Sequence, residues 1–386
     1  MLLLKGGTVL SMGPQGTLPQ GDVLIDGGKI ISVSPEIQPE SHWQVIDLHG
    51  LYVLPGLVDA HSHAGATRNE PYMDDANELT NPVQPELNSY YAINPEDPIF
   101  ADLLQDGITT SCIVPGSGNV IGGVGIVLKS AGVSYQNRVI RNPAVLKVAA
   151  GINPKAVYAA KSMAPMTRMS WSYLLRSYFT RVRAYLDAKE AGENPPYDEG
   201  LEHGALVLTG QIPVKAHVYQ HDMISVLEIA KEFDFQVTLD HAQGASDFLE
   251  ELQDPHVTGV IYGPVVMGLA PGEPCKADYA ALPLLDAQGV LTAVNTDAPA
   301  STGRTFLFHV GEAIRAGMDP ERAIAMITIN PAKILGCEDR IGSLEPGKDA
   351  DVVVFRGYPA LDVTAEVCMT VVDGSVVFDE RRGVVC

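Results

Sequence analysis

Short apolar segments that predict β-strands alternate with segments of helical periodicity through most of the chain. This alternation is typical of βα units, in which helices connect parallel strands. Helical periodicity is clearest at residues 171–189 and 222–233, and further helices are expected at 306–316 and 320–335. The predicted strands cover residues 57–61, 108–114, 124–128, 144–149, 214–217, 236–240, 257–261 and 290–295. Eight strands with intervening helices favour an α/β fold, a TIM (β/α)8 barrel, over an open doubly wound sheet.

Both ends of the chain predict closely spaced strands without helices. The N-terminal strands are expected at residues 2–4, 8–11, 22–25, 29–33 and 44–47, and the C-terminal strands at 351–355, 366–372 and 375–378. Asp373-Gly374 predicts a tight hairpin turn between the last two. Neither end can bury much surface alone. We therefore expect residues 1–54 and 340–386 to form one composite β-sandwich, and residues 55–339 to form the catalytic barrel.

Composition and charge exclude several classes of protein. With 386 residues, 46% of them hydrophobic, the chain can bury a large core. The net charge of -21, from 47 acidic and 26 basic residues, disfavours nucleic acid and anionic membrane surfaces as partners. The apolar run at residues 1–4 is too short for a signal peptide, and no segment approaches about 18 apolar residues. We therefore expect a cytoplasmic protein that does not associate with membranes.

The cysteines give no sign of a disulfide framework or a zinc–thiolate site. They are scattered, odd in number and lack Cys-x-x-Cys spacing. We expect them to be reduced and mostly packed in the interior. The five are Cys112, Cys275, Cys337, Cys368 and Cys386.

Two histidines follow the first predicted barrel strand. His61 and His63 are separated by one residue, so their imidazoles project from the same face of an extended segment and can bind one metal ion together. Taken alone, the pair could be a coincidence, because the chain has 10 histidines. Other potential ligands decide between these interpretations.

Three further potential ligands lie at predicted strand ends. His217 ends the fifth strand, His241 follows the sixth and Asp297 follows the eighth. The carboxyl ends of barrel strands meet at one face, so we expect these side chains to join His61 and His63 there. A single histidine at a strand end is often only hydrogen-bonded, and an aspartate is often a helix cap. All five together favour a site for Zn, Mn, Fe or Co.

Three motifs resemble those of the amidohydrolase superfamily. Residues 55–63, Pro-Gly-Leu-Val-Asp-Ala-His-Ser-His, are similar to its first-strand metal motif, and Asn295-Thr296-Asp297 to its eighth-strand aspartate. Residues 342–351, Gly-Ser-Leu-Glu-Pro-Gly-Lys-Asp-Ala-Asp, are similar to the segment that leads back into the terminal β-sandwich. The resemblance covers essentially the whole chain. Residues 119–123, 165–169 and 328–332 resemble the imidazolonepropionase-related, prolidase-like amidohydrolases.

The resemblance implies a metal-dependent hydrolase of a carbon–nitrogen bond. A metal held by His61, His63, His217 and, as an option, His241 would activate a water molecule. Asp297 would bind the metal weakly, act as general base and pass the proton to the leaving nitrogen. His241 would either bind a second metal or hydrogen-bond the developing oxyanion. The expected substrate is a small molecule with an amide or cyclic amide bond, and a homo-oligomer is compatible with the resemblance.

Several departures from the family pattern favour one ion over two. A two-metal site needs a bridging carboxylate, and Ile152 stands where the similar amidohydrolases carry glutamate. Lys147 would bridge only if carboxylated; the alternative is an ordinary pair with a barrel carboxylate. Tyr219 and Ala298 stand where a histidine would be unsurprising. Zinc is the expected ion, with Mn, Fe or Co as alternatives.

The candidate substrate-binding residues are Asn119, Arg168, Tyr219 and His221. Asn119 lies in a glycine-rich segment, residues 116–123, that would bring backbone amides close to a substrate or simply form a loop. The Arg168 guanidinium would bind a substrate carboxylate or form an ordinary salt bridge. Tyr219 and His221 are expected to line the pocket.

Two other functions stay open. A mononuclear heterocycle deaminase would suit the one-metal ligand set, but such deaminases usually have glutamate where this chain has Gln220. A catalytically weakened barrel with a binding role is suggested by Ile152. The intact set of four histidines and Asp297 argues against that reading, since binding alone would not require all of them.

Overall fold

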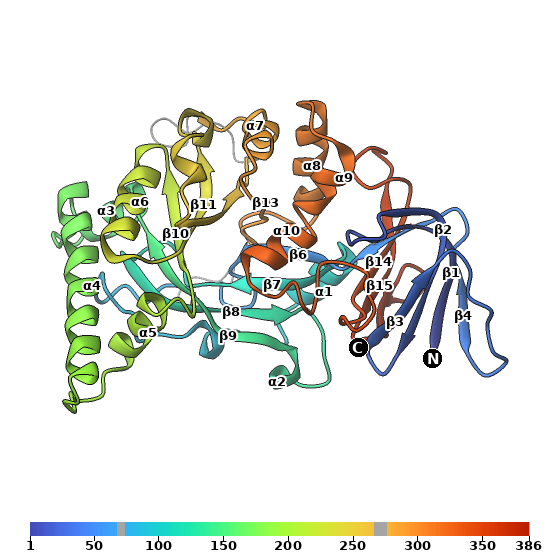
Figure 1. Cartoon of the computed structure of the whole chain (residues 1–386), viewed down its shortest axis with the longest axis horizontal. Coiled ribbons are helices and arrows are strands. Elements are labelled where there is room, and N and C mark those ends of the chain that lie inside the picture. The colour runs from blue at the N-terminus through green and yellow to red at the C-terminus, as the bar shows by residue number, and fades with distance from the viewer. Residues whose placement is uncertain (68–73, 266–275, 386) are drawn as a thin grey trace.

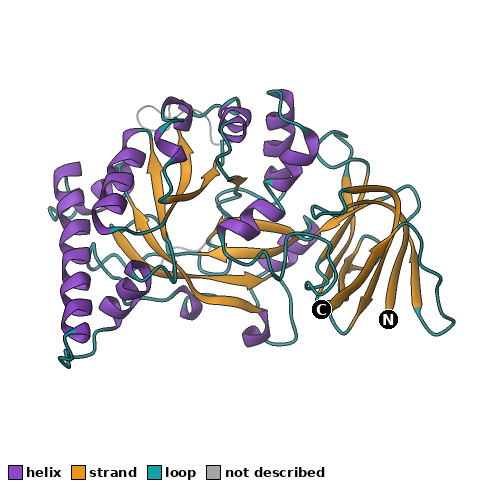
Figure 2. Cartoon of the chain, in the orientation of Figure 1, coloured by secondary structure: helices purple, strands orange, loops and turns teal. Residues whose placement is uncertain are grey.

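The computed structural model describes residues 1–67, 74–265 and 276–385 (Figure 1). Its two β-sheets lie side by side, one within a layer of helices and the other built from both ends of the chain (Figure 2). The larger part holds the candidate ligands.

All eight predicted barrel strands are present and form one sheet. They are β6 (Leu57–Ser62), β7 (Ile108–Ile113), β8 (Ile121–Lys129), β9 (Val139–Ala149), β10 (Val214–Tyr219), β11 (Val237–Gln243), β12 (Val257–Tyr262) and β13 (Thr292–Val294). Neighbours in the chain are neighbours in the sheet. Beyond β13, the amide of Asp297 donates to His61 O (3.2 Å) and the amide of His63 donates to Ala298 O (2.8 Å). These bonds nearly close the sheet into a barrel, which confirms the predicted fold class.

The third barrel strand differs from the expected parallel arrangement. β8 pairs antiparallel with β7 and β9, while the other neighbouring strands pair in parallel. Residues 114–120 are too few to carry a parallel crossover, and only the short α2 (Tyr135–Arg138) separates β8 from β9. The N-terminal end of β8, rather than its carboxyl end, therefore lies at the face where the parallel strands end.

Helices cover the outside of the barrel and its open ends. They are α1 (Ile99–Gln105), α3 (Ile152–Ala159), α4 (Arg168–Glu190), α5 (Glu199–Leu208), α6 (His221–Phe233), α7 (Ala281–Ala287), α8 (Thr305–Arg315), α9 (Pro320–Ala325) and α10 (Ile329–Ile334). Short 3-10 turns occur at Ser89–Tyr91, Ala245–Asp247 and Glu251–Gln253. The helix predicted at 320–335 is divided into α9 and α10. The helix breaks at Thr328, whose φ of -134° and ψ of -93° are not helical, and Pro331 lies in the first turn of α10, where its missing amide hydrogen is tolerated.

Both ends of the chain contribute to the second sheet. Its strands are β1 (Leu2–Leu10), β2 (Thr17–Asp26), β3 (Lys29–Ser34), β4 (Gln44–Asp47), β5 (Tyr52–Pro55), β14 (Val352–Arg356), β15 (Glu366–Val372), β16 (Ser375–Asp379) and β17 (Gly383–Val384). β5 joins the two ends, because it pairs with β1 in parallel and with β14 antiparallel. Leu4, Val23 and Val354 belong to its separate apolar core. The expected small sheet from both termini is thus present.

A buried lysine connects the two sheets. Lys129, at the end of β8, lies 2.9 Å from Asp349, 3.0 Å from Asp351 and 2.5 Å from Asp373. Burial alone would lower the pKa of Lys129, but the carboxylates of Asp351 and Asp373 raise it above its ordinary value. The ammonium group therefore stays charged between the barrel and the terminal sheet.

Within the part of the chain that the structure describes, no helix combines the length and apolar character needed to cross a bilayer. Cys112, Cys337 and Cys368 are buried and free, as expected. Cys275 and Cys386 lie outside the described residues.

Candidate metal centre

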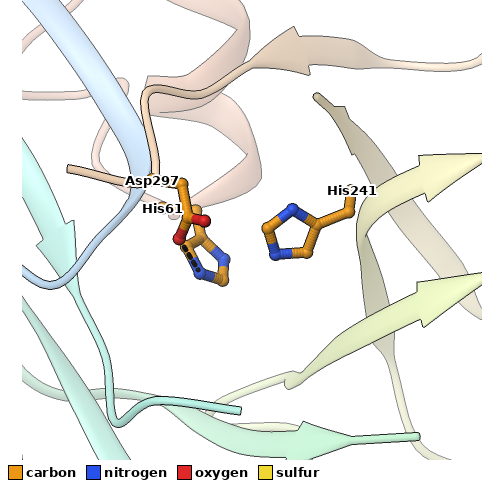
Figure 3. Close-up of side chains that lie close together, drawn as sticks. All are labelled: His61, His241 and Asp297. Atoms are coloured by element: carbon orange, nitrogen blue, oxygen red, sulfur yellow. Dashed lines mark ion pairs between the residues drawn. The ribbon is translucent and has the colours of Figure 1, made fainter. Parts of the chain in front are cut away.

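The structure brings three of the predicted ligands together at the barrel mouth. His61 lies on β6, His241 on β11 and Asp297 directly after β13. One ligand atom from each lies within 4.8 Å of the others. Figure 3 shows the Asp297 carboxylate beside the His61 ring, with the His241 ring directed toward them from the other side.

The remaining two histidines border the same cluster. His63 Nε2 lies 3.3 Å from Asp297 Oδ1, and His61 Nε2 lies 3.4 Å from the same oxygen. The His217 ring, from β10, is 4.2 Å from the His241 ring between centroids. All five residues singled out from strand ends are therefore neighbours in space.

The Nδ1 atom of each histidine has its own hydrogen-bond partner. His63 Nδ1 donates to Val114 O (2.8 Å), and His241 Nδ1 donates to Gly263 O (2.7 Å). A carbonyl only accepts, so the proton of each neutral ring is on Nδ1. His61 Nδ1 lies 2.5 Å from Asp240 Oδ2, and His217 Nδ1 lies 2.9 Å from Ser117 Oγ. These partners orient the rings and leave Nε2 to bind a metal, as metal-binding histidines usually require.

The Nε2 atoms of His61 and His63 face the Asp297 carboxylate. His241 Nε2 is buried and has no hydrogen-bond partner among the described residues. Such an atom is rare in a folded interior and is explained by a ligand bound to it. Imidazole nitrogens with one carboxylate suit a divalent transition metal. The residues therefore fit the metal that the sequence predicts.

Burial and charge set the protonation that metal binding needs. Burial lowers the pKa of His61 and His217, and it lowers the pKa of His241 to about 3. Burial alone would raise the pKa of Asp297, but the adjacent His61 and His63 rings hold it well below its usual range. At neutral pH His61, His217 and His241 are therefore neutral and the Asp297 carboxylate is ionised.

Two buried lysines lie beside this cluster. Lys147 Nζ, from β9, is 3.4 Å from His61 Nε2, and burial lowers the pKa of Lys147 to about 8. Lys215 instead pairs with Asp240 at 3.0 Å. Across the described ranges, no carboxylate lies within ion-pair distance of Lys147. Among the described residues, Lys147 therefore does not form the ordinary lysine–carboxylate pair that was the alternative. Its amine points toward the ligands instead.

Backbone geometry at the ligands is unusual. His241 and Asp297 have φ values of 65° and 55°, which non-glycine residues seldom adopt. The buried Asp59 carboxylate accepts bonds from the amides of His61 (3.2 Å) and Thr296 (3.3 Å) and from the Thr296 hydroxyl. Burial raises the pKa of Asp59 to about 7. This residue joins the start of the His61 segment to the segment that carries Asp297.

The predicted substrate-binding residues occupy different surroundings. The Tyr219 ring lies 4.9 Å from the His217 ring and 6.0 Å from the His241 ring, so it borders the cluster. Arg168 forms a bidentate salt bridge with Asp222, at 2.7 and 2.9 Å, which matches the alternative interpretation of that residue. His221 is exposed, and its ring is 5.2 Å from that of Phe248.

Asn119 uses its amide within the fold. Its Nδ2 donates to Glu78 O (2.8 Å) and its Oδ1 accepts from the Tyr158 hydroxyl (2.6 Å). The side chain is buried and anchors the glycine-rich segment. Ser117, two residues earlier, is the member of that segment whose side chain contacts a candidate ligand, His217.

Sequence reasoning did not identify several neighbours of the ligands. Asp240 precedes His241 in the chain, and this adjacency of two polar residues at the end of an apolar strand could have indicated it. Asn153 Nδ2 lies 3.2 Å from His217 Nε2, whereas Ile152 is exposed at the start of α3. Residue 153, not residue 152, therefore faces the ligands. The carbonyls of Val114 and Gly263 carry no side-chain pattern that would reveal them.

Comparison with known proteins places the chain in a family. Residues 276–377 match the model of the amidohydrolase family. The crystal structure of an amidohydrolase from Thermotoga maritima MSB8 is 35% identical, with a TM-score of 0.93 over 98% of this chain and 100% of that chain. The chain belongs to the amidohydrolase family, whose members are metal-dependent. The prediction of an enzyme that acts on carbon–nitrogen bonds is thereby confirmed.

Named relatives are more distant. The amidohydrolase tasK of Hapsidospora irregularis is 29% identical over 93% of this chain, which spans 40% of the length of that relative. An imidazolonepropionase of Picrophilus torridus is 23% identical over 92% of this chain and 91% of its own length. A 5-methylthioadenosine/S-adenosylhomocysteine deaminase of Symbiobacterium thermophilum is 26% identical over 98% of this chain and 94% of its own length. The resemblance to imidazolonepropionase-related proteins is supported.

Proposed function

We propose that this chain is a metal-dependent hydrolase that cleaves an amide or cyclic amide bond of a small molecule. One observation carries the proposal: the Nδ1 atoms of four histidines are anchored to separate partners, while the Nε2 atoms of His61 and His63 lie within 3.4 Å of the Asp297 carboxylate. Burying these polar atoms lowers the free energy of unfolding, and so does the strained backbone at His241 and Asp297. Metal binding explains both costs.

We assign the general-base role to Asp297. A divalent ion held at this site, zinc in our proposal, would lower the pKa of a water molecule and polarise a carbonyl group. Asp297 is ionised and partly accessible, so its carboxylate can accept the proton of the attacking water and deliver it to the leaving nitrogen. Tyr219 borders the space where the substrate would lie.

The hydrogen bond from His241 to Gly263 supports one of the two roles considered for this histidine. With the proton on Nδ1, its Nε2 offers a lone pair and cannot donate to an oxyanion. We therefore assign His241 as a metal ligand. The donors His61, His63, His217 and Asp297 complete the set.

We favour one ion. Asn153, a neutral amide, faces His217 from the start of α3, and the described neighbours of the cluster include no second carboxylate that faces the Nε2 atoms. Lys147 would bridge two ions only after carboxylation, and its lowered pKa increases the fraction of neutral amine available for that reaction.

Metal analysis combined with hydrolysis assays tests the proposal. The substrates are dipeptides, acylated amino acids, lactams and aminated heterocycles, and the variants are Asp297→Asn and Asp286→Asn. Asp286 pairs with Arg322 on the surface and provides the matched control. We expect about one zinc per chain, a loss of at least 10²-fold in kcat for Asp297→Asn and no change for the control. A protein without bound metal, and with equal turnover in both variants, would contradict the proposal.

A mononuclear heterocycle deaminase is the second candidate, supported by the likeness to deaminases. Gln220 stands where deaminases of this superfamily usually have glutamate. Release of ammonia from an aminated heterocycle, without hydrolysis of any amide, would favour this candidate. Bound metal without turnover of any substrate would favour the binding role instead.

A further inference from the structure

The side chain of Asn153 contacts the ring nitrogen of His217 that the proposed function assigns to the metal. Asn153 is the second residue of α3, and its Nδ2 lies 3.2 Å from His217 Nε2. An amide nitrogen only donates, so His217 Nε2 accepts and carries no proton. The ring proton is then on Nδ1, which donates to Ser117 Oγ at 2.9 Å. The lone pair of His217 Nε2 can bond to the Asn153 amide or to a metal, but not to both.

The backbone before Asn153 is fixed, whereas the side chain can turn. The amide of Ala150 donates to His217 O (3.0 Å), and Trp171 Nε1 donates to Ala149 O (2.7 Å). These bonds hold the segment between β9 and α3 against β10 and α4. The Asn153 side chain itself is only half-buried, so rotation about its side-chain bonds can move the amide away from His217 while α3 stays in place.

The histidines of the site cannot donate a hydrogen bond to a substrate oxygen. Their ring protons are used in the bonds made by Nδ1, so each Nε2 offers only a lone pair. Attack of water on an amide carbonyl places negative charge on the carbonyl oxygen, and a donor aimed at that oxygen stabilises the charge. The side-chain amide of asparagine is such a donor. Asn153 already lies at the nitrogen next to which this charge would develop.

We propose that Asn153 is a hydrogen-bond donor that changes partner. It bonds His217 Nε2 when that nitrogen carries no metal, and it bonds the carbonyl oxygen of the substrate once His217 binds the metal. This inference rests on the proposed function and adds a catalytic residue from α3, outside the barrel strands. The bond from the water oxygen to the amide carbon forms as the carbon–oxygen double bond becomes single. The electron pair moves to the substrate oxygen beside Asn153, and Asp297 takes the proton of the water.

Methylphosphonate, a tetrahedral anion that resembles the species formed by this attack, tests the assignment. Isothermal titration calorimetry measures its affinity for the zinc-loaded and the chelator-treated protein, in the wild type, Asn153→Ala and Asn194→Ala. Asn194 is exposed between α4 and α5 and provides the matched control. With zinc bound, Asn153→Ala should weaken binding roughly tenfold or more, the value of one hydrogen bond to a charged group. The control should leave the affinity unchanged.

The dependence on zinc distinguishes a change of partner from a fixed contact. Without zinc, His217 holds the Asn153 amide, so the wild type and Asn153→Ala should bind methylphosphonate equally weakly. An equal loss with and without zinc would overturn the proposal. Equal affinity of the two zinc-loaded proteins would overturn it as well.

Zinc affinity, measured by chelator competition, separates this role from structural support of His217. Asn153→Ala removes a competitor for His217 Nε2, so it should bind zinc at least as tightly as the wild type. A loss of zinc affinity as large as the loss of methylphosphonate affinity would make Asn153 a support of His217 and overturn the proposal. Thermal unfolding shows whether each variant is folded. If Asn153→Ala is not, Asn153→Leu, which keeps the shape of the side chain, takes its place.

Zinc content, measured on the same samples, keeps this inference apart from the proposed function. Bound zinc with equal methylphosphonate affinity in the wild type and Asn153→Ala contradicts only the role of Asn153. Absence of bound zinc in the wild type contradicts the proposed function and, with it, the role of Asn153.

Discussion

At the scale of single residues, Asp240 holds two buried groups in place. One carboxylate oxygen bonds His61 Nδ1 and the other pairs with Lys215 Nζ. Burial alone would raise the pKa of Asp240, but the charge of Lys215 and the hydrogen bond with His61 keep it below its ordinary value. The carboxylate therefore stays ionised and orients the His61 ring.

Substitution of Asp240 by asparagine should weaken metal binding and the fold together. We expect zinc affinity to fall by roughly 10- to 100-fold, as for other residues that orient a metal-binding histidine. Removing the charge leaves Lys215 buried without its partner, at a cost of about 3–5 kcal/mol in the free energy of unfolding. Chelator competition and urea denaturation measure the two effects, with Asp286→Asn as the control away from the metal centre. Unchanged zinc affinity would show that Asp240 does not orient His61.

His309 should make the stability of the metal-free protein depend on pH. Its folded pKa of about 4 is below the unfolded value of 6.5, so the unfolded chain binds more protons between these limits. The stabilisation is complete above pH 6.5 and is lost as the pH falls toward 4. Between pH 6.5 and 5 the loss from this residue is about 2 kcal/mol. Urea unfolding of the wild type and His309→Gln at both pH values should show a smaller loss in the variant; equal losses would contradict the expectation.

At the scale of elements, the reversed strand β8 creates the surface that holds the loop of residues 76–94. Val83 and Asn88 form β-bridges with Ile121 and Val124 of β8. Gly123 has φ of 114°, and a Cβ atom there would overlap Leu87 O. A residue without a side chain is therefore required where the loop crosses the strand.

Gly123→Ala should destabilise the protein by about 3–4 kcal/mol, because the strain of a positive φ adds to a clash with backbone atoms. Gly16 also has a positive φ, 62°, but a Cβ atom there would meet nothing within 4 Å. Gly16→Ala should cost only about 1 kcal/mol, the backbone strain alone. Thermal and urea denaturation compare the two variants. Similar losses at the two positions would mean that the loop adjusts freely.

At the scale of the whole molecule, Lys129 joins the barrel to the sheet built from both termini. It is almost fully buried among three carboxylates that belong to the C-terminal part of the chain. Lys29 contacts one of the same carboxylates, Asp349, at 2.6 Å, but its side chain is about half exposed. The two lysines therefore share Asp349 as a partner but differ in burial, and Lys129 also contacts Asp351 and Asp373.

Lys129→Met should lower the free energy of unfolding by about 3–5 kcal/mol, since it leaves the buried Asp351 carboxylate without a counter-charge. Lys29→Met should cost at most about 1 kcal/mol. Far-ultraviolet circular dichroism in urea measures both, and tryptophan fluorescence reports the barrel through the buried Trp171. Equal costs for the two variants would show that Lys129 does not couple the sheets.

A cytoplasmic location, a homo-oligomer and the absence of nucleic-acid partners stay predictions.

The sequence alone was sufficient for those features that depend on local pattern. The eight barrel strands follow from short apolar runs, the two ends from closely spaced strands and turns, and the ligand candidates from polar residues placed at strand ends. His61, His63 and Asp297 could be identified because side chains alternate along a strand and because the carboxyl ends of barrel strands meet. The family resemblance rested on the same local motifs.

Only the tertiary structure decided the direction of β8 and the partners of each polar side chain. Whether Arg168 meets a substrate or Asp222, and whether Asn119 faces the site or Tyr158, depends on residues about 40 to 55 positions away, which no local periodicity records. The carbonyls of Val114 and Gly263 determine which nitrogen of His63 and His241 is free, yet every residue has a carbonyl. Local pattern thus determined which residues could bind a metal, and long-range hydrogen bonds determined which of their atoms can.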